Sequence, residues 1–478
     1  MATISSPGIG SGLDINSIVT QLIAIERQPI VQLQREASSV QAKLSTYGKL
    51  QSGISSLRDA ASALTSSSTW GQTVGTSSDA TAVTASTNTS SKPGTYSVQA
   101  TSLASAQTNA TSAFAAADSL VGEGSLSIEL GTWVGTTFTP KAGTSTVNIT
   151  VGSPGQTVAQ LRDTINASNA GVTASVLTDV SGARLVIRST STGEENGFRI
   201  SVADTDGNNA DASGLSALAY DPQAGVSTMA RSQAAADATA LIDGLSVRSA
   251  SNTLSGVIDG VSVTLAKVTA APVLITVAQD NEAIKSKIDA FVTAYNEVNT
   301  LLAEQTKYDA ATKTAGLLQG DSAALSMRSQ LRNMIGIASG ASSAFSRLAD
   351  VGFDVRTDGS ITLSAAKLDF ALSNPTEIRK LFSNNDLVTP ANRGVALQLR
   401  DLADAILGAD GTLQARTDGL NRRLDSNQDR QDRLTDRIAL VEKRLRTQYT
   451  ALDVKMGQLS SVASYMTQQL ALINNQSN

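Results

Sequence analysis

Apolar residues near the start of the chain recur three or four positions apart, which is the spacing of one face of a helix. The residues in this row are Ile15, Ile18, Leu22 and Ile25. Asp14 stands just before them, where a carboxylate can accept hydrogen bonds from the first helical turn. Pro29 interrupts the pattern, and the spacing then resumes up to Leu64 in a rhythm close to the heptad of a coiled coil. We therefore predict two successive helices with a break or kink at Pro29.

The end of the chain carries a matching pattern, in which apolar residues alternate three and four positions apart over most of the last segment. The residues predicted to form the contact row of this helix are Leu434, Ile438, Leu445, Leu452, Met456, Met466 and Leu470. Opposite charges stand four residues apart at Asp429 with Arg433 and at Glu442 with Arg446, which suits the exposed faces of a helix. The pattern predicts a long amphipathic helix at this end.

The two apolar rows can be buried in two ways, either against the rest of this chain or against other protein molecules. A helix stabilised by an amphipathic face needs a neighbour along that face. Neither end of the sequence has enough apolar neighbours of its own to cover so long a row. The pattern therefore favours packing between molecules and leaves packing within the chain open.

The middle of the chain has a different period. Between Thr73 and Gln279, apolar residues alternate with polar ones and Gly, Asn, Asp and Ser separate the runs, which is typical of strands joined by turns. One helix is predicted inside this region, at "TVAQLRDTINAS". Helical spacing returns at Asp280, "FDVRTDGSITLS" predicts a hairpin, and "NPTEIRKLF" predicts a helix with proline in its first turn. The fold class is therefore α+β and multidomain, with a coiled-coil stalk of N- and C-terminal helices and a β-rich region inserted into the helical part.

Composition removes several classes of function. The 478 residues include 37 Lys and Arg against 42 Asp and Glu, a net charge of -5, so no basic surface suggests nucleic acid as a partner. The chain has no cysteine and no histidine, which excludes disulfides, thiolate and histidine catalysis, and Cys/His metal sites. An enzyme of this composition would have to rely on carboxylates, lysine or tyrosine.

The sequence also bears on membranes and export. No apolar run is long enough to span a bilayer, and the start lacks the basic and apolar segments of a cleaved secretory signal. We therefore expect no membrane insertion, and either a cytoplasmic protein or one that is exported unfolded without cleavage.

The candidate ligand sites are weak. Three alternate glycines in "SSPGIGSGLDIN" have no strand before them and miss the dinucleotide spacing, so a flexible leader is favoured over a phosphate site. The stretch "DTDGNNADASG" offers the oxygen ligands Asp204, Asp206, Asn208 and Asp211. Its glycine is at the fourth position, however, and Leu215 stands where a calcium loop needs a glutamate. We expect no metal and no cofactor.

Two charged clusters also favour structural roles. Glu194 and Glu195 stand together in "TGEENG", where a turn is favoured over a carboxylate pair for acid–base catalysis. The stretch "LNRRLDSNQDRQDRLTDR" is rich in arginine, but its interleaved aspartates cancel the field that an anionic surface would require. We expect a helix laced with salt bridges there, and no catalytic residue in the chain.

Several stretches together point to one family. Near the start stands "GIGSGLDINSIVTQLIAIERQPI"; further on come "YDAATKTAGLLQGDSAALSMRSQLR", "DGTLQARTDGLN" and "ALDVKMGQLSSVASYMTQQLALI". They resemble the bacterial flagellar filament cap proteins, the flagellar hook-associated protein 2 family. Within the β-rich region, "TINASNAGVTASVL" and "GARLVIRSTSTGEENGFRI" are similar to the flagellin-type hook motif named for its Ile-Asn pair, here Ile165 and Asn166. The resemblance extends over nearly the whole chain.

This resemblance, taken with the periodicity, implies four parts. A terminal helical and coiled-coil segment comprises residues 1–40 with 430–478, and a helical leg domain comprises 41–72 with 280–429. An inner β-rich head domain comprises 73–112 with 232–279, and an outer β-rich head domain, 113–231, carries the hook motif.

The resemblance also implies a function without catalysis. Such a protein is a structural cap at the distal tip of the bacterial flagellum, where it assembles into a homo-oligomeric ring and promotes folding and insertion of exported flagellin. Its partners would be its own copies, flagellin, the hook–filament junction protein, and an export chaperone with the type III flagellar export apparatus. The apolar rows of the terminal helices would grip the filament end, outside the cell. A surface adhesin that binds host mucin or glycans through the head domains is the alternative.

Overall fold

The structure, a computed structural model, describes residues 14–476. Its helices are α1 (Ile15–Glu26), α2 (Gln28–Thr65), α3 (Ser67–Trp70), α4 (Val158–Ala167), α5 (Asn281–Thr306), α6 (Ser322–Ile335), α7 (Ala365–Leu372), α8 (Pro375–Ser383), α9 (Val395–Leu407) and α10 (Thr412–Gln476). Its strands are β1 (Thr73–Ser77), β2 (Val83–Thr87), β3 (Gly94–Ser102), β4 (Thr108–Ala110), β5 (Gly124–Val134), β6 (Thr137–Pro140), β7 (Val147–Val151), β8 (Val172–Asp179), β9 (Gly182–Ser189), β10 (Gly197–Asp204), β11 (Tyr220–Asp221), β12 (Val226–Ser227), β13 (Ala230–Gln233), β14 (Ala238–Ile242), β15 (Leu245–Ser249), β16 (Thr253–Ile258), β17 (Val261–Leu265), β18 (Val273–Gln279), β19 (Tyr308–Asp309), β20 (Thr314–Ala315), β21 (Phe353–Val355) and β22 (Ile361–Leu363).

Contacts divide the chain into two units. We call Met1–Trp70 together with Glu282–Asn478 the helical unit, and Gly71–Asn281 the β unit. The insertion of a β-rich unit into helical sequence confirms the predicted α+β class. The predicted helix in the middle region is α4, the helix after Asp280 is α5, and the predicted hairpin is the pair β21–β22. The borders of the four smaller domains stay a prediction.

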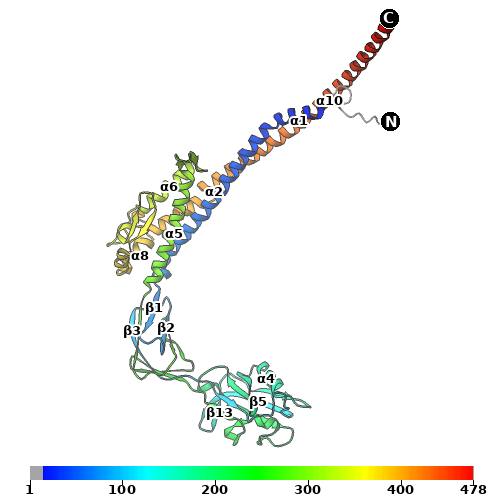
Figure 1. The fold of residues 1–478 in the computed structure, drawn as a ribbon. Helices are drawn as coiled ribbons and strands as arrows, with labels where there is room; N and C mark the ends of the chain where they lie inside the picture. Colours follow the sequence, from blue (N-terminus) through cyan, green and yellow to red (C-terminus); the bar gives the residue numbers. More distant parts are fainter. Residues whose placement is uncertain (1–13, 477–478) are drawn as a thin grey trace. The chain divides into compact units, whose positions relative to one another are not determined.

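The helical unit is organised along two long helices, α2 and α10, which lie side by side (Figure 1). α1 ends at Glu26 and α2 begins at Gln28, so the break predicted at Pro29 is confirmed. The proline lies in the first turn of α2, where a missing backbone N–H removes no helical hydrogen bond. α10 continues for 65 residues.

One large core holds the helical unit together. The lower part of α2 buries Tyr47, Leu50, Ile54 and Leu57 among residues of α5, α9 and the short helices α6 to α8. Fully burying a large apolar side chain contributes roughly 1.5–3 kcal/mol, so this face decides where α2 lies. A polar contact also fixes the hairpin to α5, because the carboxamide of Asn296 exchanges two hydrogen bonds, both of 2.8 Å, with the backbone of Ile361. The helical unit thus has a packed base.

The β unit contains two separate apolar clusters. The five-stranded sheet β1-β18-β3-β14-β15 and the three-stranded sheet β16-β17-β2 enclose the first, which we call the inner core and which includes Val83, Val98 and Ile275. The second cluster, which we call the outer core, includes Leu161 and Phe198. It is enclosed by α4 and two sheets, one of β5, β6, β7, β10, β11 and β12 and the other β13-β4-β9-β8. Each core is large enough to fix its own sheets.

The Ile-Asn pair has a clear structural role in the outer core. Ile165 is fully buried on the inner face of α4. The carboxamide of Asn166 donates to the carbonyl of Ala174 at 2.9 Å and accepts from its N–H at 2.7 Å. The Asn166 side chain therefore satisfies both backbone polar groups of Ala174 on the edge strand β8, and the neighbouring Ile165 anchors α4 in the outer core.

Candidate assembly surface on the terminal helices

α1 is held on α10 by a small cluster. Ile15, Val19 and Ile23 are buried against Ile438, with Val441, Leu445 and Tyr449 of α10 packed around them. The carboxylate of Asp14 accepts a hydrogen bond of 3.0 Å from the N–H of Ser17, as its position in the sequence predicted. This cluster, together with α2, covers the middle of α10.

The row predicted on α1 lies on two different faces. Ile15 is in the packed cluster and Ile18 is half-buried, but Leu22 and Ile25 are 36% and 66% exposed. Val19 and Ile23 take the core positions instead, because they follow Ile15 in steps of four. A helical period alone does not tell which of two adjacent rows faces the neighbour, and this is why sequence reasoning missed them. The predicted row thus leaves an exposed apolar edge on α1.

The row predicted on α10 changes character along the helix. Leu434 and Leu445 are partly buried and Ile438 is buried, so this stretch packs within the chain. Leu452, Met456, Met466 and Leu470 are exposed, at 43%, 41%, 58% and 62%. We call residues 452–472 the α10 tip. Of the contact residues predicted on α10, those of the tip are the ones that the chain leaves open to another molecule.

The α10 tip has an unusual composition for an exposed helix. Its charged residues, Asp453 and Lys455, both stand near its start, and residues 456–472 contain none. Leu459, Val462 and Tyr465 add further exposed apolar surface. Methionine adapts its shape to different neighbours because its side chain is unbranched and flexible. A partner bound here would therefore be held by apolar packing, with little contribution from ion pairs.

A change of spacing precedes the tip. The contact positions Val441, Leu445 and Tyr449 follow one another in two successive steps of four, whereas steps of three and four alternate on either side. Such an insertion in the heptad pattern locally unwinds a coiled coil. The heptad positions of the tip are therefore shifted relative to those of the preceding part of α10, and the shift lies where α1 packs on α10.

Below α1, a polar contact sets the register between α2 and α10. Asn427 is 5% exposed, and its carboxamide donates a hydrogen bond of 3.1 Å to the carbonyl of Leu33. The carboxamide oxygen of Asn427 accepts a hydrogen bond of 2.6 Å from Gln431. A buried asparagine in a coiled-coil row favours one alignment, because other alignments leave it without a partner. This pair was not predicted from the apolar pattern.

The salt bridges expected along α10 are mostly absent within the described residues. Glu442 and Arg446 pair at 2.9 Å, but Asp429 and Arg433 do not form an ion pair. In the arginine-rich stretch, Arg423 pairs with Glu36 of α2 and the other arginines have no carboxylate within 4.0 Å. The expectation of a helix laced with salt bridges was wrong, because exposed pairs contribute too little to fix two long side chains.

The other candidate sites have structural roles where they are described. Asp204 accepts hydrogen bonds from the N–H groups of Ser216 at 2.9 Å and Asp206 at 3.4 Å, so its carboxylate serves its own loop. Among residues 14–476, no group of three or more acidic residues gathers as metal ligands would. The glycine run at residues 8–12 lies outside the described residues. No helix of the described part is long and apolar enough to cross a bilayer.

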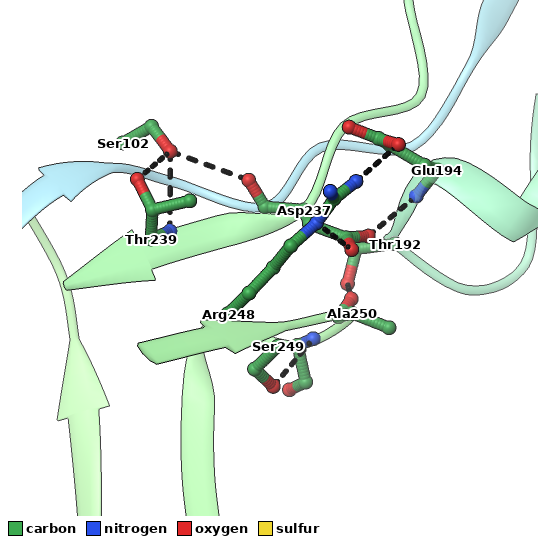
Figure 2. A network of polar contacts seen from close by, with 9 residues as sticks. Ser102, Thr192, Glu194, Asp237, Thr239, Arg248, Ser249 and Ala250 are labelled. Atoms are coloured by element: carbon green, nitrogen blue, oxygen red, sulfur yellow. Dashed lines mark hydrogen bonds and ion pairs between the residues drawn. The ribbon is translucent and has the colours of Figure 1, made fainter. Parts of the chain in front are cut away.

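Glu194 belongs to a polar junction between the inner and outer cores (Figure 2). Arg248 of β15 forms ion pairs with Glu194 and with Asp237, the latter at 2.7 Å. Asp237 in turn accepts a 2.7 Å hydrogen bond from the N–H of Glu194, and Thr192 donates to the carbonyl of Ala250 at 2.7 Å. Glu194 is therefore part of a bracket between the two cores, and Glu195 beside it is exposed.

Comparison with known proteins identifies the family. The family profile described as "Flagellar hook-associated protein 2 C-terminus" matches residues 235–461, and the profile of the N-terminus matches residues 11–107. The "Flagellin hook IN motif" matches residues 135–191, which include Ile165 and Asn166, and this confirms the motif read from the sequence.

Relatives and solved structures agree with these profiles. The chain is 31% identical to the Flagellar hook-associated protein 2 of Escherichia coli (strain K12), over 98% of both chains. It is also 31% identical to the B-type flagellar hook-associated protein 2 of Pseudomonas aeruginosa, again over 98% of each. The crystal structure of the flagellar cap protein FliD D1-D2-D3 domains from Escherichia coli has a TM-score of 0.61 at 26% identity, covering 79% of this chain and 99% of that one. The chain therefore belongs to the flagellar hook-associated protein 2 family.

Proposed function

We propose that this protein caps the distal end of a bacterial flagellar filament, where it assembles with its own copies and promotes the folding and insertion of flagellin. The observation that carries the proposal is the α10 tip, an exposed apolar row on a segment that has no charged residue after Lys455. A helix with such a face is stable in water only when another helix covers it. The covering helices are those of axial subunits at the filament end.

The composition of the tip suits a contact that must be made and broken repeatedly. Apolar packing is non-directional, and methionine side chains repack against different neighbours. A row of buried ion pairs would instead demand one fixed partner geometry. The exposed edge of α1 formed by Leu22 and Ile25 extends the apolar surface beside α10. The cap can thus hold successive filament subunits through one surface.

The finer partners follow from the same role. The protein reaches the filament tip through the type III flagellar export apparatus, escorted by an export chaperone and without loss of a signal peptide. It binds first to the hook–filament junction protein, before flagellin is added. The absence of cysteine is compatible with export as an unfolded chain, because no disulfide has to form afterwards.

The test is to locate the native protein on intact cells. Gold-labelled antibody raised against the β unit, viewed by electron microscopy, should label only filament tips. A strain that lacks the gene should shed unassembled flagellin into the medium, and the wild-type gene should restore filaments. Label along the shaft, or label that stays inside the cell, would contradict the proposal.

A further inference from the structure

Arginine occupies one position of every heptad along α10. Arg416, Arg423, Arg430, Arg437 and Arg444 follow one another at intervals of seven residues. Each directly precedes a residue that faces α2 or α1, such as Leu424 or Ile438. Because a helix rises about 1.5 Å per residue, these side chains form a row with a spacing of about 10.5 Å. We call these five residues the arginine row.

Only the first two arginines of the row form ion pairs within the described residues. Arg416 pairs with Asp321, and Arg423 pairs with Glu36 through Nε at 3.1 Å and Nη2 at 2.5 Å. Arg430, Arg437 and Arg444 have no carboxylate within 4.0 Å among the described residues. These three guanidinium groups therefore remain available to a second molecule.

Repulsion between neighbouring arginines of α10 is only partly offset within the helix. Arg433 stands three residues after Arg430 and four before Arg437, so the three like charges are neighbours on one side of α10. Like charges at these spacings destabilise a helix by about 0.2–0.5 kcal/mol per pair. Arg433 has Asp429 four residues before it and Asp436 three residues after it, which partly offset this repulsion. Arg430 and Arg437, in contrast, have no acidic residue three or four positions away. A neighbouring acidic surface would remove it.

A groove lies beside these arginines. It has a volume of 530 Å³ and runs between the start of α2 and α10. Its apolar part is formed by Pro29, Leu33 and Leu434, and its polar edge by Gln32, Glu36, Arg430, Arg433 and Arg437. Glu36 is already engaged by Arg423, so the groove presents an excess of positive charge. It suits a helix with acidic side chains at heptad spacing.

The same helix carries such a row of acids on another side. Asp418, Asp425 and Asp432 are also seven residues apart, and each directly follows a residue of the row that faces α2. All three are exposed, and none forms an ion pair among the described residues, although Gln414 and Gln428 donate to two of them. Two residues along a helix turn the direction by about 200°, so the two rows lie on nearly opposite flanks of α10.

We propose that this aspartate row of one copy docks against Arg430, Arg437 and Arg444 of the arginine row, and against the groove beside them, in the next copy. The inference deepens the proposed function, because it rests on self-assembly of the cap. Both rows repeat at the same interval, so parallel helices can pair them at successive turns. A surface and its complement on opposite flanks make a head-to-tail contact, which can close into a ring. Charge then selects the neighbour and its orientation.

Charge exchange on the full-length protein tests this contact. One variant carries Arg430→Glu with Arg437→Glu, a second carries Asp425→Arg with Asp432→Arg, and a third combines all four changes. The control carries Arg35→Glu with Lys49→Glu, two exposed α2 residues that form no ion pair among the described residues, and has the same charge change as the first variant. Circular dichroism verifies that each variant is folded. Analytical ultracentrifugation over a range of concentration and salt gives the strength of assembly.

We expect each double variant to assemble at least about tenfold more weakly than the wild type. The combined variant should recover most of that loss, the control should assemble like the wild type, and salt should weaken the wild-type assembly. If the wild type assembles and both double variants assemble equally well, or if the combined variant is as weak as they are, the pairing of the two rows is refuted. If the wild type assembles at no concentration, self-assembly itself fails, and the proposed function fails with it.

Discussion

The guanidinium group of Arg416 holds the carboxylate of Asp321 with two nitrogens, Nε at 3.0 Å and Nη2 at 2.6 Å from the same oxygen. The side chain of Asp321 is only 4% exposed, and its other oxygen accepts from the N–H groups of Ala323 and Ala324 in the first turn of α6. Burial raises the pKa of Asp321, but hydrogen bonding and the charge of Arg416 outweigh this and leave it below the ordinary value. One carboxylate thus joins α6 to the base of α10.

Replacing Arg416 by methionine should destabilise the helical unit. Methionine keeps the length of the side chain but leaves a buried carboxylate without its cation. Breaking a fully buried pair costs about 3–5 kcal/mol, and because Arg416 is itself 43% exposed we expect about 2 kcal/mol. Urea unfolding followed by circular dichroism measures the change. Arg422→Met, at an exposed arginine that has no ion pair among the described residues, is the control and should change little; equal losses in both variants would contradict the role of the pair.

The stability of the helical unit should also depend on pH through Glu377, in the first turn of α8. Its carboxylate accepts from Lys380 at 2.7 Å, from the Ser342 hydroxyl at 2.8 Å and from the Ser343 N–H at 2.6 Å. These contacts, that with Lys380 foremost, lower the pKa of Glu377 to about 2. The ordinary value is about 4.3, so the unfolded chain takes up the proton first. The stabilisation is complete above that pH and is lost as the pH falls towards 2.

The measurement is a comparison of wild type and Glu377→Gln by urea unfolding at several pH values. The wild type should be more stable near pH 7, and the difference should shrink between about pH 4.3 and pH 2. Glu304→Gln changes an exposed glutamate of α5 that has no ion pair within the described residues, and its stability should follow the wild type at every pH. A constant difference between wild type and Glu377→Gln across this range would show that the carboxylate is not linked to folding.

The fold class could be predicted from periodicity because the two kinds of element repeat differently. Rows such as Leu50, Ile54 and Leu57 recur in helical steps, and the middle strands alternate. What could not be predicted is which side of an amphipathic helix is covered. Val19 and Leu22 are both apolar and both fit the period, yet only Val19 is buried. That choice depends on where α10 lies, which is a tertiary fact.

The polar contacts were also beyond reach of the pattern. Asn427, in the apolar row of α10, finds its partner on Leu33, a residue nearly four hundred positions earlier in the chain. Asp321 and Arg416 are separated by 95 positions. Single-sequence reasoning sees only neighbours within a turn or two, so it named the local pair Asp429 with Arg433, which does not form, and could not see the distant ones.

Replacing Gly193 by alanine should loosen the junction between the inner and outer cores. Gly193 has φ +105°, and a Cβ atom there would lie 2.5 Å from Cβ of Ala250 and 2.8 Å from its Cα. Gly225 also has positive φ, at +77°, but a Cβ there meets nothing within 4 Å. Alanine is strained at both positions, and more so at Gly193, where ψ is 150°, than at Gly225, where ψ is 13° and the backbone is left-handed. Only Gly193→Ala adds a clash, and we expect it to cost about 1–3 kcal/mol more than Gly225→Ala.

Calorimetry of the full chain and limited proteolysis check this prediction. Gly193→Ala should lower the melting temperature of the β unit more than Gly225→Ala does. It should also speed cleavage near residues 190–196 and 234–238, where the bracket of Arg248, Glu194 and Asp237 lies. Equal effects of the two glycine substitutions would mean that the close contact with Ala250 does not hold the two cores together.

Replacing Leu452 by aspartate should stop filament growth if the α10 tip is the surface that holds the filament. Leu452 is the first exposed position of the apolar row, and a charge there would have to be buried without a partner when a helix packs on it. Val454→Asp is the matched control, because Val454 is 53% exposed but stands two residues away, on the other side of α10. Complementation of a deletion strain, with filament length measured by electron microscopy, reads out both variants.

We expect Leu452→Asp to give no filaments, or filaments much shorter than wild type, while Val454→Asp restores nearly normal ones. The β unit should stay folded in both variants, because neither residue lies within it. Met466→Asp, as a separate variant, should act like Leu452→Asp. Since the tip carries no charge beyond Lys455, raised salt should not rescue either of these two variants. Normal motility with Leu452→Asp would place the grip elsewhere on the terminal helices, and equal failure of both variants would point to loss of α10 itself instead of loss of one face.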